Sequence, residues 1–176
     1  MTKLIFINLY GTILPVEREA DSKIALRHGF LEFLKRYKSM RFAILTYESK
    51  EVAVPDIIRF GLLEKVEQIY TLENMNRVRM GNKNRVGFKN GYPQPDLRTW
   101  ARGDFRTNED QSIVISDNPL DVIATDWYGV KLIEVPLFKN GHDTFSFDNV
   151  SVGSWYNDAR YFIHSLKGKQ MRISLK

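Results

Sequence analysis

Residues 4–14 read Leu4-Ile5-Phe6-Ile7-Asn8-Leu9-Tyr10-Gly11-Thr12-Ile13-Leu14, an apolar run that passes into a turn. An apolar run rich in branched residues is typical of a strand that is buried on both faces of a sheet. Gly11 permits the turn because it has no Cβ, and the hydroxyl of Thr12 can bond the loop backbone. We therefore expect a buried strand over Lys3–Ile7, followed at once by a polar loop.

Similar apolar runs recur along the chain between stretches with helical spacing. This alternation predicts an α/β fold: a three-layer, doubly wound, Rossmann-like and mostly parallel sheet of about five strands. In such sheets the binding crevice lies beyond the carboxyl ends of the strands, so Asn8, Thr46 and Asp117 should meet there. The expected strands are Lys3–Ile7, Arg41–Thr46, Val66–Tyr70, Ser112–Ile115 and Val130–Glu134.

Helical spacing of apolar residues predicts the helices and the domain organisation. Apolar side chains between Leu26 and Tyr37 fall on one helical face. Residues 71–95 contain turn residues with little periodicity, so we expect an irregular basic insertion at about 72–106. We expect a single domain over residues 1–166 and a basic tail over 167–176. The other predicted helices are Ser49–Phe60, Pro95–Arg102, Pro119–Thr125 and Trp155–Leu166.

The composition narrows the function classes. The chain has 176 residues, 43% of them hydrophobic, which is enough for one well-packed core. It contains no cysteine, so disulfides, thiolate catalysis and cysteine-ligated metals are excluded. We find neither a signal-peptide pattern nor about 18 consecutive apolar residues, so we expect no membrane span. The expected location is the cytoplasm, with the nucleus as an alternative.

The net charge of +5 is unevenly distributed. Residues 77–106 hold eight basic residues against two acidic ones, a balance of +6, and the last ten residues add four basic residues and no acid. These segments suit contact with phosphate or with an acidic partner, although charge runs are more often solvated surface. The basic residues of the first segment are Arg77, Arg79, Lys83, Arg85, Lys89, Arg98, Arg102 and Arg106.

Residues 4–14 resemble the hhhhDxDGTL signature of the haloacid dehalogenase-like (HAD) phosphatases. Further segments resemble motifs of one HAD branch, the phosphatases of the RNA polymerase II C-terminal domain and their NLI-interacting-factor-like relatives. Residues 27–34 resemble RPGxxxFL, residues 43–47 a strand that ends in Thr or Ser, and residues 52–55 YADP. Residues 91–97 resemble GxYxKDL, and residues 113–119 resemble a final DDSP or DNSP motif.

The resemblance implies a HAD-like fold and, in an active member, a covalent mechanism. The first aspartate attacks phosphorus, and the second protonates the leaving oxygen. A threonine or serine and a lysine hold the phosphoryl oxygens, and a distal acid helps to bind magnesium. In this chain Asn8 stands in the place of the nucleophile and Tyr10 in the place of the proton donor. Pro95 stands in the place of the lysine, with Lys89 or an arginine of the basic segment as a substitute from a shifted loop, and Ser116 takes the first acidic position.

The candidate site residues follow from this correspondence, and each also has a structural interpretation. Asn8 suits a turn cap, Thr46 suits the N-cap of the next helix with Ser49 as its competitor, and residues 116–119 suit a helix start. No catalytic residue is assigned: Asn8 and Tyr10 are degenerate, whereas Thr46 and Asp117 are retained. The phosphate-binding candidates are Asn8, Gly11, Thr12, Thr46 and Lys89, and the metal-binding candidates are Asp117 and Asp121.

The sequence therefore predicts a pseudophosphatase, a HAD scaffold that binds a macromolecular or phosphorylated partner. An amide is not a useful nucleophile, so catalysis should be impaired. We expect a protein partner and no cofactor, with magnesium only if the chain is active. One alternative is an atypical magnesium-dependent phosphatase that acts on phosphoproteins or nucleic-acid ends. The second is a nucleic-acid binder that uses residues 77–106, where Phe88, Tyr92, Trp100 and Phe105 stand among the basic residues.

Overall fold

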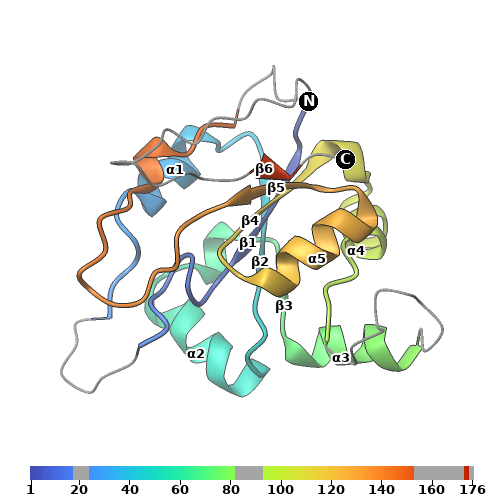
Figure 1. The fold of residues 1–176 in the computed structure, drawn as a ribbon, viewed down its shortest axis with the longest axis horizontal. Helices are drawn as coiled ribbons and strands as arrows, with labels where there is room; N and C mark the ends of the chain where they lie inside the picture. The colour runs from blue at the N-terminus through green and yellow to red at the C-terminus, as the bar shows by residue number, and fades with distance from the viewer. Residues whose placement is uncertain (18–23, 82–92, 153–172, 175–176) are drawn as a thin grey trace.

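A six-stranded sheet runs through the middle of the molecule (Figure 1). The computed structural model describes residues 1–17, 24–81, 93–152 and 173–174. The strand order is β3-β2-β1-β4-β5-β6, in which the first five strands are parallel and β6 is antiparallel to β5. The strands are β1 (Leu4–Asn8), β2 (Arg41–Leu45), β3 (Gln68–Tyr70), β4 (Ser112–Ser116), β5 (Lys131–Glu134) and β6 (Ile173–Ser174).

Helices cover both faces of the sheet, as Figure 1 shows. On one face lie α1 (Phe30–Arg36) and α2 (Lys50–Arg59), which pack on Ile5 and Ile7 of β1. The other face carries α3 (Leu72–Gly81), α4 (Leu97–Phe105) and α5 (Pro119–Tyr128), which pack on Leu4 and Phe6. Because β1 is buried on both faces, its sequence is a continuous apolar run without polar alternation.

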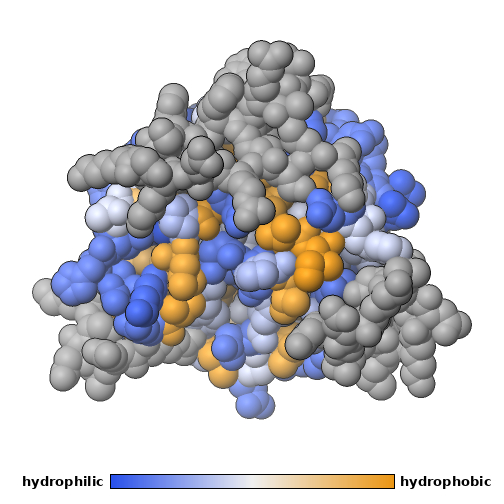
Figure 2. Space-filling model, in the orientation of Figure 1, coloured by the Kyte–Doolittle hydropathy of each residue, from blue (hydrophilic) through white to orange (hydrophobic). Residues whose placement is uncertain are grey.

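The chain between β5 and the end of the described core returns over the α1 face. Its short 3-10 helix η4 (Phe147–Asn149) packs on α1, where the rings of Phe30 and Phe147 lie 5.1 Å apart. Two further 3-10 helices, η1 (Leu63–Lys65) and η3 (Glu109–Gln111), precede β3 and β4. On the face in Figure 2, the coloured apolar residues reach the surface in small areas separated by hydrophilic ones. Most of the described apolar side chains are buried in the two core layers.

The predicted fold class and strands are confirmed, and strand ends differ by one or two residues. Two predictions are wrong. The first helix begins at Phe30 and not near Leu26, because Gly29 has a φ of 79° and starts the helix after a turn. The segment 72–106 is not irregular throughout, because α3 occupies its start, whereas α4 at its other end corresponds to the predicted helix over Pro95–Arg102. The predicted helix over 155–166 lies outside the described residues, as does most of the tail over 167–176.

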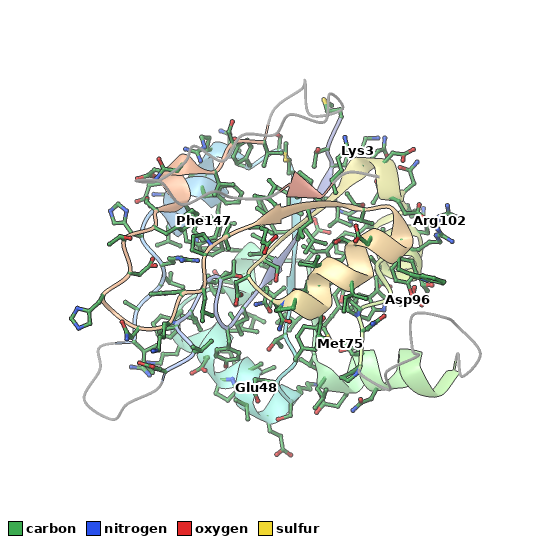
Figure 3. All side chains as sticks on the ribbon, viewed as in Figure 1. Lys3, Glu48, Met75, Asp96, Arg102 and Phe147 are labelled. Atoms are coloured by element: carbon green, nitrogen blue, oxygen red, sulfur yellow. The ribbon has the colours of Figure 1, made fainter. Side chains whose placement is uncertain are left out.

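The topology brings the carboxyl ends of the parallel strands to one end of the molecule. In Figure 3, Lys3, which precedes β1, lies at the top, and Glu48, which follows β2, lies at the bottom together with Met75 of α3. The chain runs from β1 outward to β3 and then returns to the other side of β1 as β4. This reversal is the switch point at which doubly wound sheets bind ligands. The candidate residues at the ends of β1, β2 and β4 therefore share one crevice.

Candidate functional site at the carboxyl ends of β1, β2 and β4

Asn8 is the last residue of β1 and is almost completely buried. Its Nδ2 donates to the Asp117 carboxylate oxygen Oδ1 at 2.9 Å and to the backbone carbonyl of Tyr10 at 2.9 Å. Both partners only accept hydrogen bonds, so they fix which end of the amide faces them. Asn8 thus caps the turn, as its structural interpretation predicts, and it also holds Asp117.

The Gly11-Thr12 turn forms the seat of the Asp117 carboxylate. The Thr12 hydroxyl donates to Asp117 Oδ1 at 2.8 Å and accepts from the Asp117 backbone N–H at 3.1 Å. Gly11 has a φ of 94°, and a Cβ at this position would lie 2.5 Å from Asp117 Oδ2. Only glycine leaves room for the carboxylate here. The Gly11-Thr12 pair therefore positions Asp117, which follows a strand 105 residues after Thr12 in the chain.

Opposing effects act on the charge of Asp117. Partial burial raises the pKa of its carboxyl, whereas hydrogen bonds from Thr12 and Asn8 and the positive charge of Arg27 act to lower it. Burial is the largest of these effects, and the resulting pKa lies above the ordinary value of 3.8. Asp117 is the retained carboxylate of the crevice, but two neutral donors already occupy its Oδ1.

Arg27 supplies a buried positive charge that the sequence analysis missed. Its guanidinium forms a two-pronged ion pair with Asp143, with Nε and Nη2 at 2.9 and 3.0 Å from the two carboxylate oxygens. The same guanidinium lies 4.3 Å from the ring centre of Phe145 and 5.1 Å from that of Phe138. The partners are 116 residues apart, and no sequence spacing links them. The ion pair anchors the loop after β5 beside the Gly11-Thr12 turn.

Tyr10 directs its hydroxyl toward α2. The hydroxyl donates to Asp56 Oδ2 at 2.5 Å and lies 3.5 Å from the carbonyl oxygen of Val52, both on that helix. A hydroxyl that donates its proton to a carboxylate inside the protein is not aimed at a leaving oxygen in the crevice. In this geometry Tyr10 joins the β1 loop to α2.

Thr46 lies directly after β2 and is buried. Its backbone N–H donates to the Tyr70 carbonyl at 2.9 Å, and its hydroxyl oxygen accepts from the Glu48 backbone N–H at 3.1 Å. The predicted N-cap role of Thr46 is wrong, because Ser49 occupies the N-cap position of α2. Thr46 instead stabilises the loop between β2 and α2, within the shared end of the sheet.

Asp121 lies one helical turn beyond Asp117 and is fully buried. Its two carboxylate oxygens accept hydrogen bonds from the Tyr47 and Ser116 hydroxyls, each at 2.6 Å. Burial raises the pKa of Asp121 to about 6, although both hydroxyls act to lower it. Burial likewise raises the pKa of the Tyr47 hydroxyl well above its ordinary value. Asp121 therefore joins the β2–α2 loop to the start of α5.

The predicted helix start at residues 116–119 is confirmed. Asn118 is the N-cap of α5, and its side-chain oxygen accepts from the Leu120 backbone N–H at 2.9 Å. Pro119 begins the helix, where its missing N–H costs no hydrogen bond. This capping leaves the Asp117 side chain free of any role in the helix and turned toward Thr12 and Asn8.

The candidate phosphate-binding residues Asn8, Gly11, Thr12 and Thr46 come together at this end of the sheet, whereas Lys89 lies outside the described residues. Among the described residues, no group of three or more His, Cys, Asp or Glu side chains is arranged to hold a metal ion. Thr2 Oγ1 is the one buried side-chain polar atom in the described part of the chain without a hydrogen-bond partner. The described polar side chains buried in the crevice thus already bond to one another or to the backbone.

The basic segment at 77–106 is partly neutralised within the fold. Arg98 and Arg102 of α4 both pair with the carboxylate of Glu109, the second at 3.1 Å. Arg106 ends α4 in the left-handed conformation. Arg77 and Arg79 fall in α3, whereas Lys83, Arg85 and Lys89 lie outside the described residues. Nucleic-acid binding by this segment stays a prediction. None of the described helices is both long and apolar enough to cross a membrane.

Comparisons with known proteins support the fold. No family model and no curated protein matches the chain. A predicted phosphoglycolate phosphatase from Haemophilus somnus superposes with a TM-score of 0.60 at 12% identity, over 81% of this chain and 88% of that one. A HAD-superfamily hydrolase of subfamily IA from Geobacter sulfurreducens gives a TM-score of 0.58 at 11% identity, over 81% and 95%.

A third structure adds a ligand. CbbY from Rhodobacter sphaeroides, in a mutant with one aspartate replaced by asparagine and in complex with xylulose-1,5-bisphosphate, gives a TM-score of 0.59 at 13% identity. The match covers 82% of this chain and 91% of that one. Identities this low support an inference about architecture and not about activity. The chain has an α/β fold similar to that of these solved HAD-superfamily structures.

Proposed function

We propose that this protein is a HAD-fold pseudophosphatase that acts as a binding or regulatory protein for a macromolecular or phosphorylated partner. The observation that carries the proposal is the 2.9 Å hydrogen bond from Asn8 Nδ2 to Asp117 Oδ1. It places a neutral amide at the end of the central strand, where the motif resemblance puts the attacking carboxylate. We also propose that the protein is related to the C-terminal-domain phosphatases, whose motifs the sequence resembles.

The chemistry of covalent phosphoryl transfer explains why this substitution is severe. The nucleophile must offer an electron pair to phosphorus, and an amide is too weak a nucleophile for that step. Here the Asn8 amide also donates hydrogen bonds to the Tyr10 carbonyl and to Asp117. Tyr10, in the place of the proton donor, bonds to Asp56 on α2. Loss of a nucleophile in a covalent mechanism costs many powers of ten in rate, on the order of 10⁴ or more.

The donor set around Asp117 does not fit a catalytic magnesium ion. Magnesium prefers about six oxygen ligands in near-octahedral geometry, usually including carboxylates. The crevice offers one carboxylate, and its Oδ1 accepts from Asn8 and Thr12. The other acid, Asp121, is fully buried with both oxygens bonded to hydroxyls. The Asn8 N–H stabilises the negative charge of Asp117 by a hydrogen bond, without a cation.

Binding without catalysis is compatible with this fold. The CbbY mutant holds a sugar bisphosphate although one of its aspartates is an asparagine. By analogy, a phosphorylated group on the partner of this protein would approach the same end of the sheet. It would have to displace hydrogen bonds that the crevice now makes internally, such as Thr12 to Asp117. A macromolecular partner that contacts a wider surface can offset that cost.

Hydrolysis of p-nitrophenyl phosphate in the presence of magnesium tests the proposal. We expect the wild-type protein to release no more nitrophenol than a buffer blank, and Asn8→Ala to behave like the wild type. Thr12→Val is a useful second variant, because it disturbs the Asp117 seat and leaves Asn8 in place. Magnesium-dependent turnover in the wild type that Asn8→Ala abolishes would contradict the proposal.

An atypical magnesium-dependent phosphatase acting on phosphoproteins or nucleic-acid ends is the alternative. The retained Asp117 carboxylate, partly buried with a raised pKa, favours it because a carboxyl in such surroundings suits proton transfer. This alternative predicts magnesium-dependent hydrolysis of a phosphopeptide or of a 5′-phosphorylated oligonucleotide. Asp117→Asn would abolish that activity and Asn8→Ala would spare it, which separates this reading from a conventional HAD mechanism.

A further inference from the structure

The two edges of the sheet are finished differently. At one edge β6 pairs with β5, so that Ser174 lies opposite Leu132 and Ile173 opposite Ile133. At the other edge lies β3, which pairs with β2 on its inner side. Within residues 1–17, 24–81, 93–152 and 173–174, no strand pairs with the outer side of β3. An open edge of this kind presents backbone donors and acceptors that an extended chain can bond.

A groove runs beside this edge on the α2 side. Its volume is about 470 Å³, and its apolar lining comes from Val54 of α2, Leu63 of η1 and Ile69 of β3. Ile69 packs with the α1–α2 core layer, so it faces the helices and not the opposite side of the sheet. Leu63 is 48% exposed. The polar part of the lining consists of Lys50, Thr71, Glu73 and Asn74. We call this feature the β3 groove.

The segment that supplies α2, η1 and β3 to the β3 groove is acidic in a basic protein. Residues 48–73 carry three basic residues and six acidic ones, a balance of −3 in a chain of +5. Arg41 pairs with Glu67 at 2.6 Å and offsets part of this charge. Glu73 stays ionised, because a hydrogen bond from the Thr71 hydroxyl lowers the pKa of its carboxyl. The acidic residues are Glu48, Glu51, Asp56, Glu64, Glu67 and Glu73.

This charge selects among the occupants of an open edge. A second copy that paired β3 with β3 would bring two acidic surfaces together, and like charges oppose such contact. A nucleic acid would be repelled for the same reason. A basic peptide would be attracted. At the opposite edge β6 pairs with β5, so this sheet does accept a further extended segment at an edge.

We propose that the β3 groove binds an extended basic peptide that adds to the sheet as a strand beside β3. Side chains of an added strand alternate between faces, so every second residue of the peptide would enter the groove. Apolar side chains that enter the groove would contact Val54, Leu63 and Ile69, while the acidic residues of this segment would attract the positive charge of the peptide as a whole. The proposal rests on the proposed binding function, since it names the class of partner.

Fluorescence anisotropy with synthetic heptapeptides tests it at low salt. The probe alternates lysine and valine. One control peptide replaces lysine by glutamate, and a second carries N-methyl groups on its central backbone nitrogens, which removes the donors that a strand needs. We expect saturable binding of the probe, weakened at least about tenfold in either control, as expected for charge steering combined with strand addition. Equal binding of all three peptides, or binding of none, would overturn the proposal.

Matched variants of the protein locate the contact. Leu63→Lys places a positive charge in the groove, whereas Ile58→Lys makes the same change at an exposed α2 residue that does not line it. Both side chains are about half exposed, at 48% and 55%, so both variants should fold. We expect Leu63→Lys to weaken probe binding at least about fivefold and Ile58→Lys to change it little. Equal effects of the two variants would contradict the location.

Two further outcomes are informative. A dimer of the wild type that Leu63→Lys dissociates would overturn the proposal, because the occupant would then be a second copy of the chain. The peptide assay and the hydrolysis assay also fail separately. A protein that hydrolyses phosphate esters and binds the probe refutes only the pseudophosphatase proposal. A protein that is inert and ignores the probe refutes only the peptide proposal.

Discussion

Asp117 and Asp121 lie one helical turn apart after β4, yet their surroundings differ in kind. Asp117 is partly exposed at the crevice and accepts hydrogen bonds from the Asn8 amide and the Thr12 hydroxyl. Asp121 is fully buried and accepts from the Tyr47 and Ser116 hydroxyls. Asp117 is within reach of a ligand, whereas Asp121 links the β2–α2 loop to the end of β4 through buried hydrogen bonds. Of the two carboxylates, only Asp117 is accessible at the crevice, and its neighbour Asn8 is a neutral amide.

The largest expected loss of stability comes from replacing the Asn8 amide, which donates a hydrogen bond to the Asp117 carboxylate, with a second carboxylate. Asn8→Asp would place two carboxylates at the 2.9 Å separation now spanned by an N–H···O bond. Mutual repulsion in a buried site disfavours two ionised groups, so we expect a loss of about 2–4 kcal/mol in the free energy of unfolding at pH 7. Urea unfolding in a chelating buffer measures it.

Asn8→Ala is the control for that prediction, because it removes the same hydrogen bonds without adding a charge. It should destabilise the protein less than Asn8→Asp at pH 7. The gap between the two variants should narrow on acidification, since one shared proton relieves the repulsion. An Asn8→Asp variant as stable as the wild type at pH 7 without metal would show that the two side chains separate easily.

The second effect tests the Asp121 side of the comparison through pH. Its pKa of about 6 in the folded protein lies above the ordinary value of 3.8. Its contribution to stability is therefore full below pH 3.8 and is lost as the pH rises through 6. We expect the stability of Asp121→Asn relative to the wild type to increase by about 2 kcal/mol between pH 4 and pH 7.

Measuring the difference between the two proteins isolates Asp121. The lowered pKa of Glu109 adds its own pH dependence to both proteins and cancels in the difference, whereas the difference also includes the electrostatic coupling of Asp121 to Asp117. Chemical unfolding at several pH values gives the required free energies. A difference that stays flat across this window would mean that Asp121 does not titrate as its burial implies.

A smaller loss of stability is expected when Asp121 loses one of its two hydrogen-bond donors, the Tyr47 hydroxyl. Tyr47→Phe removes the donor that lies 2.6 Å from Asp121 Oδ1. We expect a loss of about 1–2 kcal/mol at pH 7, because a hydrogen bond to a buried charge is lost without replacement. The loss should shrink at low pH, where Asp121 is protonated. Thermal unfolding of the two proteins side by side checks both statements.

The smallest expected loss of stability concerns Tyr10, whose hydroxyl bonds to Asp56 and not to Asp121. Tyr10→Phe removes the 2.5 Å hydrogen bond to Asp56 on α2. Asp56 is only partly buried, so water can replace the lost donor and the cost should be about 0.5–1 kcal/mol. The same thermal unfolding experiment ranks the two tyrosines. A larger loss of stability for Tyr10→Phe than for Tyr47→Phe would contradict the expectation that the buried Tyr47–Asp121 hydrogen bond contributes more than the Tyr10–Asp56 hydrogen bond.

Sequence reasoning predicted the strands because β1 and its neighbours are buried on both faces, which leaves a continuous apolar run in the sequence. It also placed Asn8, Thr46 and Asp117 at one end of the sheet. It did not predict the Arg27–Asp143 ion pair or the Tyr47–Asp121 bond. Those contacts join residues 116 and 74 positions apart, and nothing local in the sequence marks them. The helix α3 was missed because the turn residues that follow it obscured its short pattern.

The central claim is that the neutral Asn8 amide faces Asp117 where a magnesium site would need a second carboxylate. A magnesium titration followed by melting temperature tests it most directly, with wild type and Asn8→Asp compared. We predict no magnesium-dependent change in the wild type and a rise in the variant, because only the variant offers two facing carboxylates. Clear stabilisation of the wild type by magnesium, with no additional gain in Asn8→Asp, would contradict the account.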